Sequence, residues 1–449
     1  MEIHHFSSEA LPPQESSLQI PKVHPAREEE IHPGKTVLVI GSGGREHAIV
    51  DALSRSPRVQ NIYACPGNPG MAKHATCVPI GVTDIKDLVD FAKEKNVDLT
   101  VVGPEASLAA GVADAFKAEG LRIFGPTKAG ARIESSKEFA KEIMEKYGVP
   151  TGFYKSFDNY EEAKSYAESL PLPTVIKYDG LAAGKGVVVA TSREEADAAL
   201  RDMLLDSAFG QGRVLIEEFL DGPEFSFMCA VGGRKVYPLA LAQDHKRAYD
   251  GDKGPNTGGM GAYSPLPFIT DEVREKALKE ILQRTADGLA EEGIDYTGIL
   301  YGGLILTKDG PKVIEFNARF GDPETEVVLP RLESDIYELF DSAIDSADHE
   351  TKWSDDACLG VVLASDGYPG SYKKGVELDF SECSNVYHMG TAVKDGKLQS
   401  AGGRVAMVTG KGKTLEEAAA NAYADVKKAA KTGLFYRSDI GKAALKTKN

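Results

Sequence analysis

The feature that most constrains the fold of this chain lies between Lys35 and Thr127. There, short apolar runs alternate with glycine- or proline-rich turns. Residues 36–40 form a continuous apolar run that ends in Gly41-Ser42-Gly43-Gly44, which is typical of a buried parallel strand followed by a turn and a helix. Further strands are predicted at 61–64, 99–102 and 122–124, with helices at 46–54, 85–95 and 108–119. This alternation predicts an open, doubly wound α/β domain, in which ligands bind at the carboxyl ends of the strands.

The pattern changes after residue 135. A helix capped by Ser135 or Ser136 is predicted to run to Tyr147, and a longer helix is predicted at 271–288. Predicted strands lie at 174–177, 186–190, 213–219, 224–231, 235–241, 298–306 and 312–320. The last hundred residues carry strands near 358–365 and 405–409 and a helix at 415–432. The chain is therefore expected to combine an α/β domain with α+β domains.

Composition narrows the class of protein. The 449 residues carry 52 Lys+Arg against 68 Asp+Glu, a net charge of −16, which argues against general nucleic-acid binding and against a polybasic membrane contact. The sequence has no run of 18 apolar residues and no secretory signal pattern. Its five cysteines form no C-x-x-C pair, which fits reduced thiols and predicts a cytoplasmic protein. Residues 1–34 show no hydrophobic period and are predicted to be a flexible extension.

Two glycine loops differ from the common nucleotide motifs. In Gly41-Ser42-Gly43-Gly44-Arg45-Glu46 the third glycine of the dinucleotide fingerprint is replaced by Glu46, although a phosphate still suits a glycine turn before a helix. The loop at 180–186 has three residues between its first two glycines and no Ser or Thr after Lys185, so it is not a P-loop. It joins two predicted strands, and both a cover over a triphosphate and a plain flexible turn remain open.

The strand predicted at 312–320 carries an acidic pattern. Glu315, Asn317 and Arg319 alternate and so share one face of the strand. A carboxylate and an amide oxygen there can hold a hard cation, and the arginine can hold a transferring phosphoryl group or a carboxylate. The alternative is a solvated strand face. The polar segment 321–326, which follows at once, favours a site.

Several segments together resemble one family. They are 41–47, 179–186, 217–220, Gln243-Asp244-His245-Lys246-Arg247, 256–265 and 315–324. Over residues 35–441 the chain resembles the glycinamide ribonucleotide synthetases, also called phosphoribosylamine–glycine ligases, of the ATP-grasp superfamily. The resemblance implies an N-terminal α/β domain at 35–135, an ATP-grasp region at 136–350 with a lid-bearing subdomain at 155–225, and a C-terminal domain at 351–449. It also implies ATP-dependent ligation of glycine to 5-phosphoribosylamine through glycyl phosphate, an early step of purine synthesis.

The resemblance further implies a set of site residues. Glu315 and Asn317 would bind Mg²⁺ or Mn²⁺, and the preceding strand at 301–306 offers no further acidic ligand. Arg319, Asp244 and Asp322 would take part in catalysis, and His245 would be structural rather than a base. The ATP-binding residues would be Lys137, Lys177, Asp179, Leu181, Ala182, Gly184, Gly186, Glu217, Glu218, Phe219, Leu220 and Glu224. The residues binding glycine or phosphoribosylamine would be Gly43, Gly44, Asn68, Pro104, Glu105, Lys246, Gly258 and Gly259.

Three other functions stay open at this point. One is an ATP-grasp carboxylate–amine ligase with a different acceptor, and another is an inactive nucleotide-binding protein. The third is a nicotinamide-dependent oxidoreductase that uses the first glycine loop. For the ligase, the expected partners are glycine, phosphoribosylamine and ATP, with no nucleic acid and no membrane, and the chain is expected to be a monomer.

Overall fold

The computed structural model describes residues 34–182, 185–431 and 433–446. The predicted extension therefore lies outside the described residues, apart from Gly34. No helix in the described ranges is long and apolar enough to cross a membrane.

The N-terminal part is a five-stranded parallel sheet in the order β3-β2-β1-β4-β5. Its strands are β1 (Lys35–Gly41), β2 (Val59–Pro66), β3 (Thr76–Cys77), β4 (Leu99–Val102) and β5 (Ile123–Phe124). Residues 37–40 are fully buried, and Ile40 pairs with both Cys65 and Val102, so the turns after β1, β2 and β4 reach the same edge of the sheet. The predicted doubly wound domain is confirmed.

The helices of this domain are α1 (Gly44–Ser54), α2 (Ile85–Glu94), α3 (Glu105–Ala109) and α4 (Val112–Ala118). The prediction of a single helix at 108–119 is wrong, because Gly111 separates two helices, α3 and α4, in this region. That glycine has φ +88°, a left-handed conformation that cannot continue a right-handed helix. Helix α5 (Lys128–Ser135) then leads to α6 (Lys137–Tyr147), and the Ser136 hydroxyl caps α6 by accepting from the Phe139 N–H at 3.1 Å.

A four-stranded antiparallel sheet follows, which we call the lid sheet. Its order is β6-β9-β7-β8, from β6 (Tyr154–Phe157), β9 (Val214–Glu218), β7 (Thr174–Tyr178) and β8 (Val187–Ala190). Helices α7 (Tyr160–Ser169) and α8 (Arg193–Leu200), the latter prolonged by a π-helical turn at Arg201–Leu205, pack with these strands. The lid sheet has a hydrophobic core of its own, which includes Phe157, Ile176 and Leu200.

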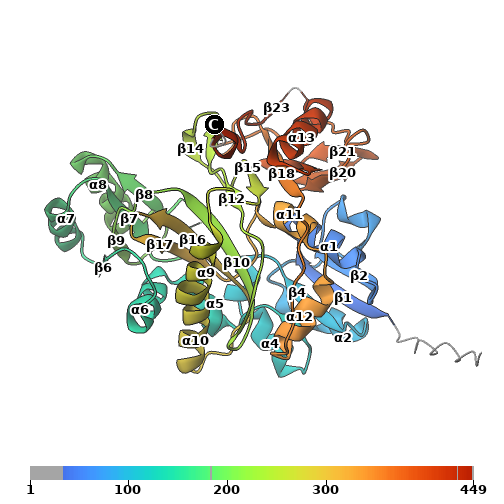
Figure 1. Cartoon of the computed structure of the whole chain (residues 1–449), viewed down its shortest axis with the longest axis horizontal. Helices are drawn as coiled ribbons and strands as arrows, with labels where there is room; N and C mark the ends of the chain where they lie inside the picture. The colour runs from blue at the N-terminus through green and yellow to red at the C-terminus, as the bar shows by residue number, and fades with distance from the viewer. Residues whose placement is uncertain (1–33, 183–184, 432, 447–449) are drawn as a thin grey trace, which may run out of the picture. The chain divides into compact units, whose positions relative to one another are not determined.

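The central sheet is antiparallel, in the order β11-β10-β16-β17. It contains β11 (Lys235–Pro238), β10 (Glu224–Gly232), β16 (Thr297–Thr307) and β17 (Gly310–Asn317). Helices α9 (Asp271–Ala277) and α10 (Arg284–Glu291), joined by a π-helical turn at Leu278–Gln283, lie along it (Figure 1). The helix predicted at 271–288 thus exists, interrupted and three residues longer. The predicted β16–β17 hairpin is confirmed, although β17 ends at Asn317.

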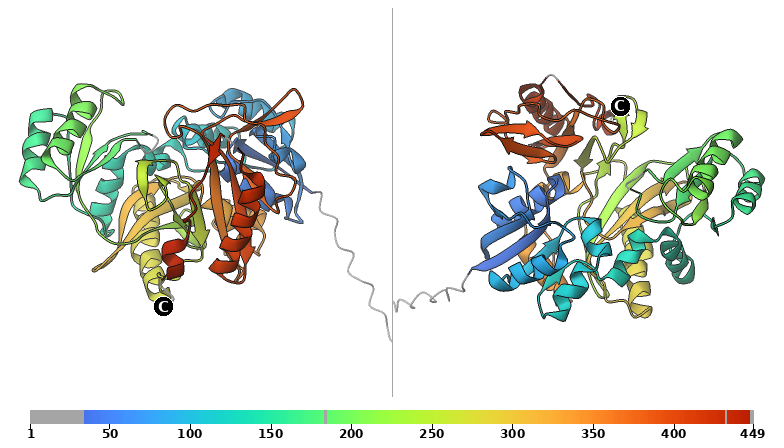
Figure 2. Two further views of the ribbon diagram at one scale, coloured as in Figure 1. Left: turned by 90° about the horizontal axis from the view of Figure 1, so that it is seen from above. Right: turned by 180° about the vertical axis from the view of Figure 1, so that it is seen from behind.

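The third large sheet joins segments that are far apart in the sequence (Figure 2). Its strands are β12 (Gln243–Asp244), β15 (Gly261–Ser264), β18 (Ala357–Ser365), β22 (Arg404–Gly412), β19 (Val386–His388) and β23 (Leu434–Phe435). Two exposed ribbons, β13 (Arg247–Tyr249) with β14 (Lys253–Asn256) and β20 (Thr391–Lys394) with β21 (Lys397–Ser400), stand beside it. The remaining helices are α11 (Thr325–Val328), α12 (Ile336–Ile344), α13 (Leu415–Ala429) and α14 (Lys442–Leu445). Through β12, which contacts β10, this sheet adjoins the central sheet.

Candidate active site

The two lysines predicted to bind ATP, Lys137 and Lys177, lie between the lid sheet and the central sheet. Lys177, on β7, forms an ion pair with Glu217 (Nζ to Oε2, 2.8 Å) and donates to the Ile314 carbonyl at 3.1 Å. Lys137 begins α6 and donates to the Gly180 carbonyl at 2.8 Å. Both ammonium groups act electrostatically on Glu315 and lower its pKa. The structure therefore brings two cations from separate elements to the acidic strand.

Glu217 faces this lysine cluster with its carboxylate. Besides Lys177, its Oε2 lies 3.6 Å from Nζ of Lys141, and all three side chains are buried. Burial lowers the pKa of Lys141 to about 8, although the Glu217 carboxylate opposes the shift. The Glu217 side chain thus pairs with two lysines of the site. Sequence reasoning missed Lys141, because a lysine in an amphipathic helix usually marks the solvent face.

The glycine hairpin is tied to α6 by Asp179. Its Oδ1 accepts from the backbone N–H of Lys137 at 2.6 Å and of Glu138 at 3.3 Å, which caps the helix. Leu181 is 46% exposed, Ala182 is half-buried, and the Gly186 carbonyl accepts from the Tyr178 N–H at 2.7 Å. Ala183 and Gly184 lie outside the described residues. The hairpin is therefore fixed at both ends, with an apolar side chain at its exposed part.

The predicted ATP-binding residues Phe219 and Leu220 follow β9 directly. Phe219 is 39% exposed and Leu220 is half-buried, while Glu218 accepts from the Phe153 N–H through Oε2 at 3.2 Å. Phe153 itself is 47% exposed. Two exposed aromatic rings beside a strand end suit a planar base. Glu224, at the start of β10, is exposed and lies 3.3 Å from Nζ of Lys246 through Oε2.

Glu315 and Asn317 lie on β17 and face the same side of the central sheet. Burial would raise the pKa of Glu315, but Lys246, Lys177, Lys137 and Arg319 together lower it, so the carboxylate is ionised. The position opposite Glu315 on β16 is Gly303, so the neighbouring strand adds no ligand. No group of three or more His, Cys, Asp or Glu side chains able to hold a metal occurs in the described ranges. The two oxygen donors suit a hard cation that takes its other ligands from phosphate and water.

Arg319 is placed among carboxylates from the N-terminal half of the chain. Its Nε lies 3.5 Å from Oε1 of Glu134 and 3.9 Å from Oε2 of Glu105, and its Nη2 donates to Oδ1 of Asn317 at 3.3 Å. Glu134 also accepts from the Ala318 N–H at 2.8 Å, which fixes the strand end. Arg45, from α1, donates to the same Phe320 carbonyl as Arg319. Sequence reasoning missed Glu134 and Arg45, since neither belongs to a motif with Arg319.

Asp322 is held by an arginine of the C-terminal strands. Arg404, on β22, lies 3.4 Å from Oδ1 of Asp322 through Nη2, and its Nη1 donates to the carbonyls of Asp322 at 3.2 Å and of Gly258 at 3.0 Å. Arg404 and Arg45 lower the pKa of Asp322 against the effect of burial. Gly259 also contacts Arg404 through its carbonyl, at 3.4 Å. Arg404 therefore joins three predicted site residues, and no sequence signal distinguished it.

A small pocket beside the acidic strand is lined by charged side chains. The residues that line it include Glu224, Ser226, Asp244, Lys246, Tyr301 and Glu315. Burial raises the pKa of Asp244 and of the adjacent Glu324, and the Asp244 charge adds to the effect on Glu324. Asp244, followed by Glu224 and Glu315, raises the pKa of Lys246 against the effect of burial. Asp244 and Lys246 thus lie with the metal-ligand candidate, whereas the contribution of Glu324 was missed.

The N-terminal loops lie at the common edge of the parallel sheet. The Gly43 N–H donates to Oε2 of Glu46 at 3.0 Å, and Pro104 precedes α3, which begins at Glu105. A Cβ on Gly44 would lie 2.5 Å from Oε1 of Glu326, so this turn is closely packed.

Asn68 is buried, and its side chain is fully used inside the protein. Nδ2 donates to the carbonyls of Ser42 and His388, both at 2.9 Å, and Oδ1 accepts from the N–H groups of Gly70 and Met71. As placed, Asn68 joins the first glycine turn to the C-terminal strands and leaves no free donor for a substrate.

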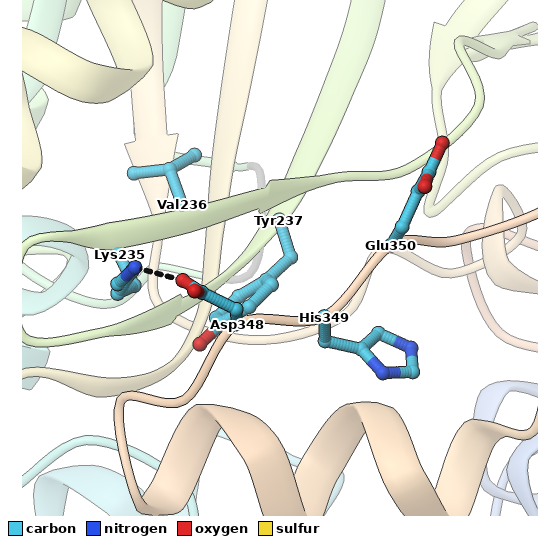
Figure 3. Close-up of a pocket in the computed structure, with 6 residues that line it drawn as sticks. All are labelled: Lys235, Val236, Tyr237, Asp348, His349 and Glu350. Atoms are coloured by element: carbon cyan, nitrogen blue, oxygen red, sulfur yellow. Dashed lines mark hydrogen bonds and ion pairs between the residues drawn. The ribbon is translucent and has the colours of Figure 1, made fainter.

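A second pocket has a different character. It is lined by Lys235, Val236, Tyr237, Asp348, His349 and Glu350. Lys235 and Asp348 neutralise each other in an ion pair, and the His349 ring points away from that pair (Figure 3). Its charged groups do not converge on one point, so the active-site candidate is the acidic strand with its four cations.

A lid sheet above an antiparallel sheet, with lysines from the lid side facing an acidic strand, defines the ATP-grasp class of ligases. Comparison with known proteins gives the family. Residues 35–134, 135–325 and 358–443 match the models of the phosphoribosylglycinamide synthetase N domain, ATP-grasp (A) domain and C domain. The chain belongs to the phosphoribosylglycinamide synthetase family, whose members are carbon–nitrogen ligases.

Individual relatives support the same family assignment. The chain is 53% identical over 415 residues to the phosphoribosylamine–glycine ligase of Halalkalibacterium halodurans, which covers 91% of this chain and 97% of that protein. The crystal structure of the Thermotoga maritima phosphoribosylamine–glycine ligase superposes with a TM-score of 0.81 at 35% identity, over 90% of this chain and all of that one. The biotin carboxylase domain of Hydrogenobacter thermophilus 2-oxoglutarate carboxylase shares the fold, with a TM-score of 0.66 at 18% identity over 90% of this chain and 91% of that one.

Proposed function

We propose that this chain ligates glycine to 5-phosphoribosylamine with ATP, giving glycinamide ribonucleotide, ADP and phosphate in purine biosynthesis. The observation that carries the proposal is the convergence of Lys137, Lys177, Lys246 and Arg319 on the ionised Glu315. Four cations around one carboxylate suit a site for polyphosphate and a bridging metal ion. The family and the names of the relatives supply the identity of the acceptor.

Glu315 and Asn317 would hold the cation, Mg²⁺ or Mn²⁺. The donor set fits, because it offers one ionised carboxylate and one amide oxygen on the same strand face. When bound, the ion would neutralise charge on the transferring phosphoryl group. Oδ1 of Asn317 also accepts from Nη2 of Arg319. This hydrogen bond fixes the two side chains relative to each other.

The chemistry assigned to the protein's own residues is positioning and charge stabilisation. Lys137 and Lys177 bind the phosphates of ATP under the glycine hairpin, and Arg319 stabilises the transferring group. A glycine carboxylate oxygen attacks the γ-phosphorus, and the bond to ADP breaks to give glycyl phosphate. The amine of phosphoribosylamine then attacks the acyl carbon, phosphate leaves, and the amine proton passes to a carboxylate. Burial raises the pKa of Asp244, which suits it to orient the amine and to take that proton.

Phosphoribosylamine is proposed to bind at the carboxyl edge of the N-terminal sheet. Gly43, Gly44, Pro104 and Glu105 lie at this edge. Asp322 reaches it too, because a Cβ on Gly43 would lie 3.5 Å from Oδ2 of Asp322. Gly258 and Gly259 would close the site through Arg404. We further propose that the protein is cytoplasmic and a monomer. Gel filtration can test the oligomeric state.

A pair of variants tests the assignment. Glu315→Gln should bind less Mn²⁺ in the presence of ADP, measured by electron paramagnetic resonance, and should lower turnover by at least about a hundredfold. Glu377→Gln is the matched control, because the Glu377 side chain is exposed and pairs with the exposed Lys397. Normal Mn²⁺ binding and turnover in folded Glu315→Gln would refute the metal assignment. Wild-type protein that forms no glycinamide ribonucleotide from the three substrates would refute the proposed function.

A further inference from the structure

The segment from Arg437 to Gly441, between β23 and α14, packs behind residues 244–247, which lead from β12 to β13 and include Asp244 and Lys246. The Gly441 N–H donates to Nε2 of His245 at 3.3 Å. Nη1 of Arg437 donates to the Arg247 carbonyl at 3.1 Å. The C-terminal segment therefore contacts both residues that flank Lys246, although it lies almost 200 positions away in the sequence.

Arg437 is the centre of this contact. Its residue exposure is 1%, and its guanidinium donates to both carboxylate oxygens of Asp439, at 2.8 and 2.9 Å, and pairs with Asp252 of the β13–β14 ribbon at 2.9 Å. Asp439 in turn accepts from the Gly251 N–H at 2.9 Å. A buried, bidentate arginine with two carboxylates is a rigid arrangement. It fixes the ribbon and the C-terminal segment to each other.

His245 joins that arrangement to the active site. Its backbone is held on both sides, because its N–H donates to the Gly261 carbonyl at 2.9 Å and its carbonyl accepts from the Met260 N–H at 2.7 Å. In an extended chain the side chains of Asp244 and Lys246 point opposite to that of His245. Asp244 and Lys246 line the pocket with Glu315, and the His245 ring faces Gly441. Burial, with the nearby Arg437, lowers the pKa of His245 to about 4, so the ring is neutral and Nε2 can accept.

We propose that residues 437–441 are a positioning element of the ligase site: by holding His245 and Arg247 from behind, they fix Asp244 and Lys246 against Glu315. The assignment rests on the proposed function, since it gives His245 a role in that reaction. His245 is a positioning residue and touches no substrate. Loosening His245 should misplace Asp244 and Lys246 and so lower kcat. The KM for ATP should not change, because ATP would bind between the lid sheet and β17.

Two substitutions of His245 separate this role from plain packing. His245→Leu fills similar space but removes the acceptor for Gly441, whereas His245→Gln keeps an acceptor. Relative to wild type, we expect His245→Leu to lower kcat by about 10- to 100-fold with the KM for ATP changed less than about threefold. His245→Gln should recover at least half of wild-type kcat. His349→Leu is the control, since it makes the same change in a histidine of the second pocket.

Hydrogen exchange supplies a readout that does not depend on activity. In His245→Leu the amides of Gly441, of residue 245 and of Thr257, whose N–H donates to the Lys246 carbonyl at 2.7 Å, should exchange at least about tenfold faster, while those of β7 and β9 should not change. Unchanged exchange at these amides would overturn the proposal, whether or not the enzyme is active. Equal kcat in wild type and His245→Leu, or equal loss in the Leu and Gln variants, would overturn it too. If the wild type has no ligase activity but His245→Leu shows the predicted exchange pattern, only the proposed function is refuted.

Discussion

Glu217→Gln tests whether a buried carboxylate holds the phosphate-binding lysines in place. The substitution keeps the shape and one acceptor but removes the charge that faces Lys177 at 2.8 Å and Lys141 at 3.6 Å. All three side chains are at most 7% exposed, so solvent cannot replace the lost partner. Breaking a buried ion pair by removing one partner costs about 3–5 kcal/mol. Lys141 can release its proton, because its pKa is already lowered to about 8, so we expect about 3 kcal/mol at pH 7.

The sign of the pH dependence follows from Lys141. In the unfolded chain this lysine keeps its proton up to about pH 10.4, whereas the folded protein releases it at a lower pH. Between pH 7 and 9 the unfolded state therefore binds more protons, so stability should rise with pH in both proteins. It should rise more in the variant, because the Glu217 charge that raises the pKa of Lys141 is gone. The deficit of Glu217→Gln relative to wild type should accordingly shrink over this range.

Urea unfolding at pH 7 and pH 9 measures these quantities, and binding of a non-hydrolysable ATP analogue measures the effect on the site. Glu218→Gln is the matched control for the unfolding measurement, because Glu218 is half-buried, is the next residue in β9, and its contact to the Phe153 N–H can be made by an amide oxygen. The control should lose less than about 0.5 kcal/mol. A loss in Glu217→Gln as small as in the control, with unchanged analogue affinity, would refute the account of the lysine cluster.

Three further predictions concern other parts of the chain. Amides at 180–182 and 185–186 should exchange more slowly with a bound ATP analogue, and equal protection in both states would contradict a lid role for the hairpin. Burial, reinforced by the charges of His388 and His74, lowers the pKa of His47 to about 3. Below pH 6.5 the unfolded chain therefore takes up a proton that the folded protein does not, so stability falls as the pH is lowered. His47→Gln should therefore lose about 2 kcal/mol less than wild type between pH 6.5 and 5 in urea unfolding, and an identical pH dependence would refute this. Gly44→Ala should cost about 1–3 kcal/mol and raise the KM for phosphoribosylamine, because its Cβ would lie 2.5 Å from Glu326; an unchanged melting temperature and KM would contradict that packing.

The parts of the fold that sequence predicted are those with a local signal. The strands of the N-terminal sheet could be located because each apolar run ends in a glycine or proline turn. The β16–β17 hairpin could be located because residues 308–310 form a turn between two alternating runs. The exposed ribbon of β13 and β14 was missed, since its polar residues carry no periodic pattern and its conformation depends on contacts with Arg437.

The same division holds for the site. Glu315, Asn317 and Arg319 share one strand, so their spacing alone predicted a common face. The partners of Arg319 could not be predicted, because Glu134 lies 185 positions before it and reaches it only when α5 packs beside β17. Arg404 holds Asp322 from the C-terminal strands in the same way. The placement of Lys141, Glu134 and Arg404 depends on packing between elements that no local pattern records.

The fate of the glycine carboxylate oxygen tests the central claim most directly. Glycine labelled with ¹⁸O in its carboxylate, incubated with ATP, phosphoribosylamine and Mg²⁺, transfers one labelled oxygen to the γ-phosphorus if glycyl phosphate forms. The account predicts one ¹⁸O atom in each released phosphate, detected by mass spectrometry, and no phosphate above background when glycine is omitted. Unlabelled phosphate released in step with glycinamide ribonucleotide would contradict the acyl phosphate route.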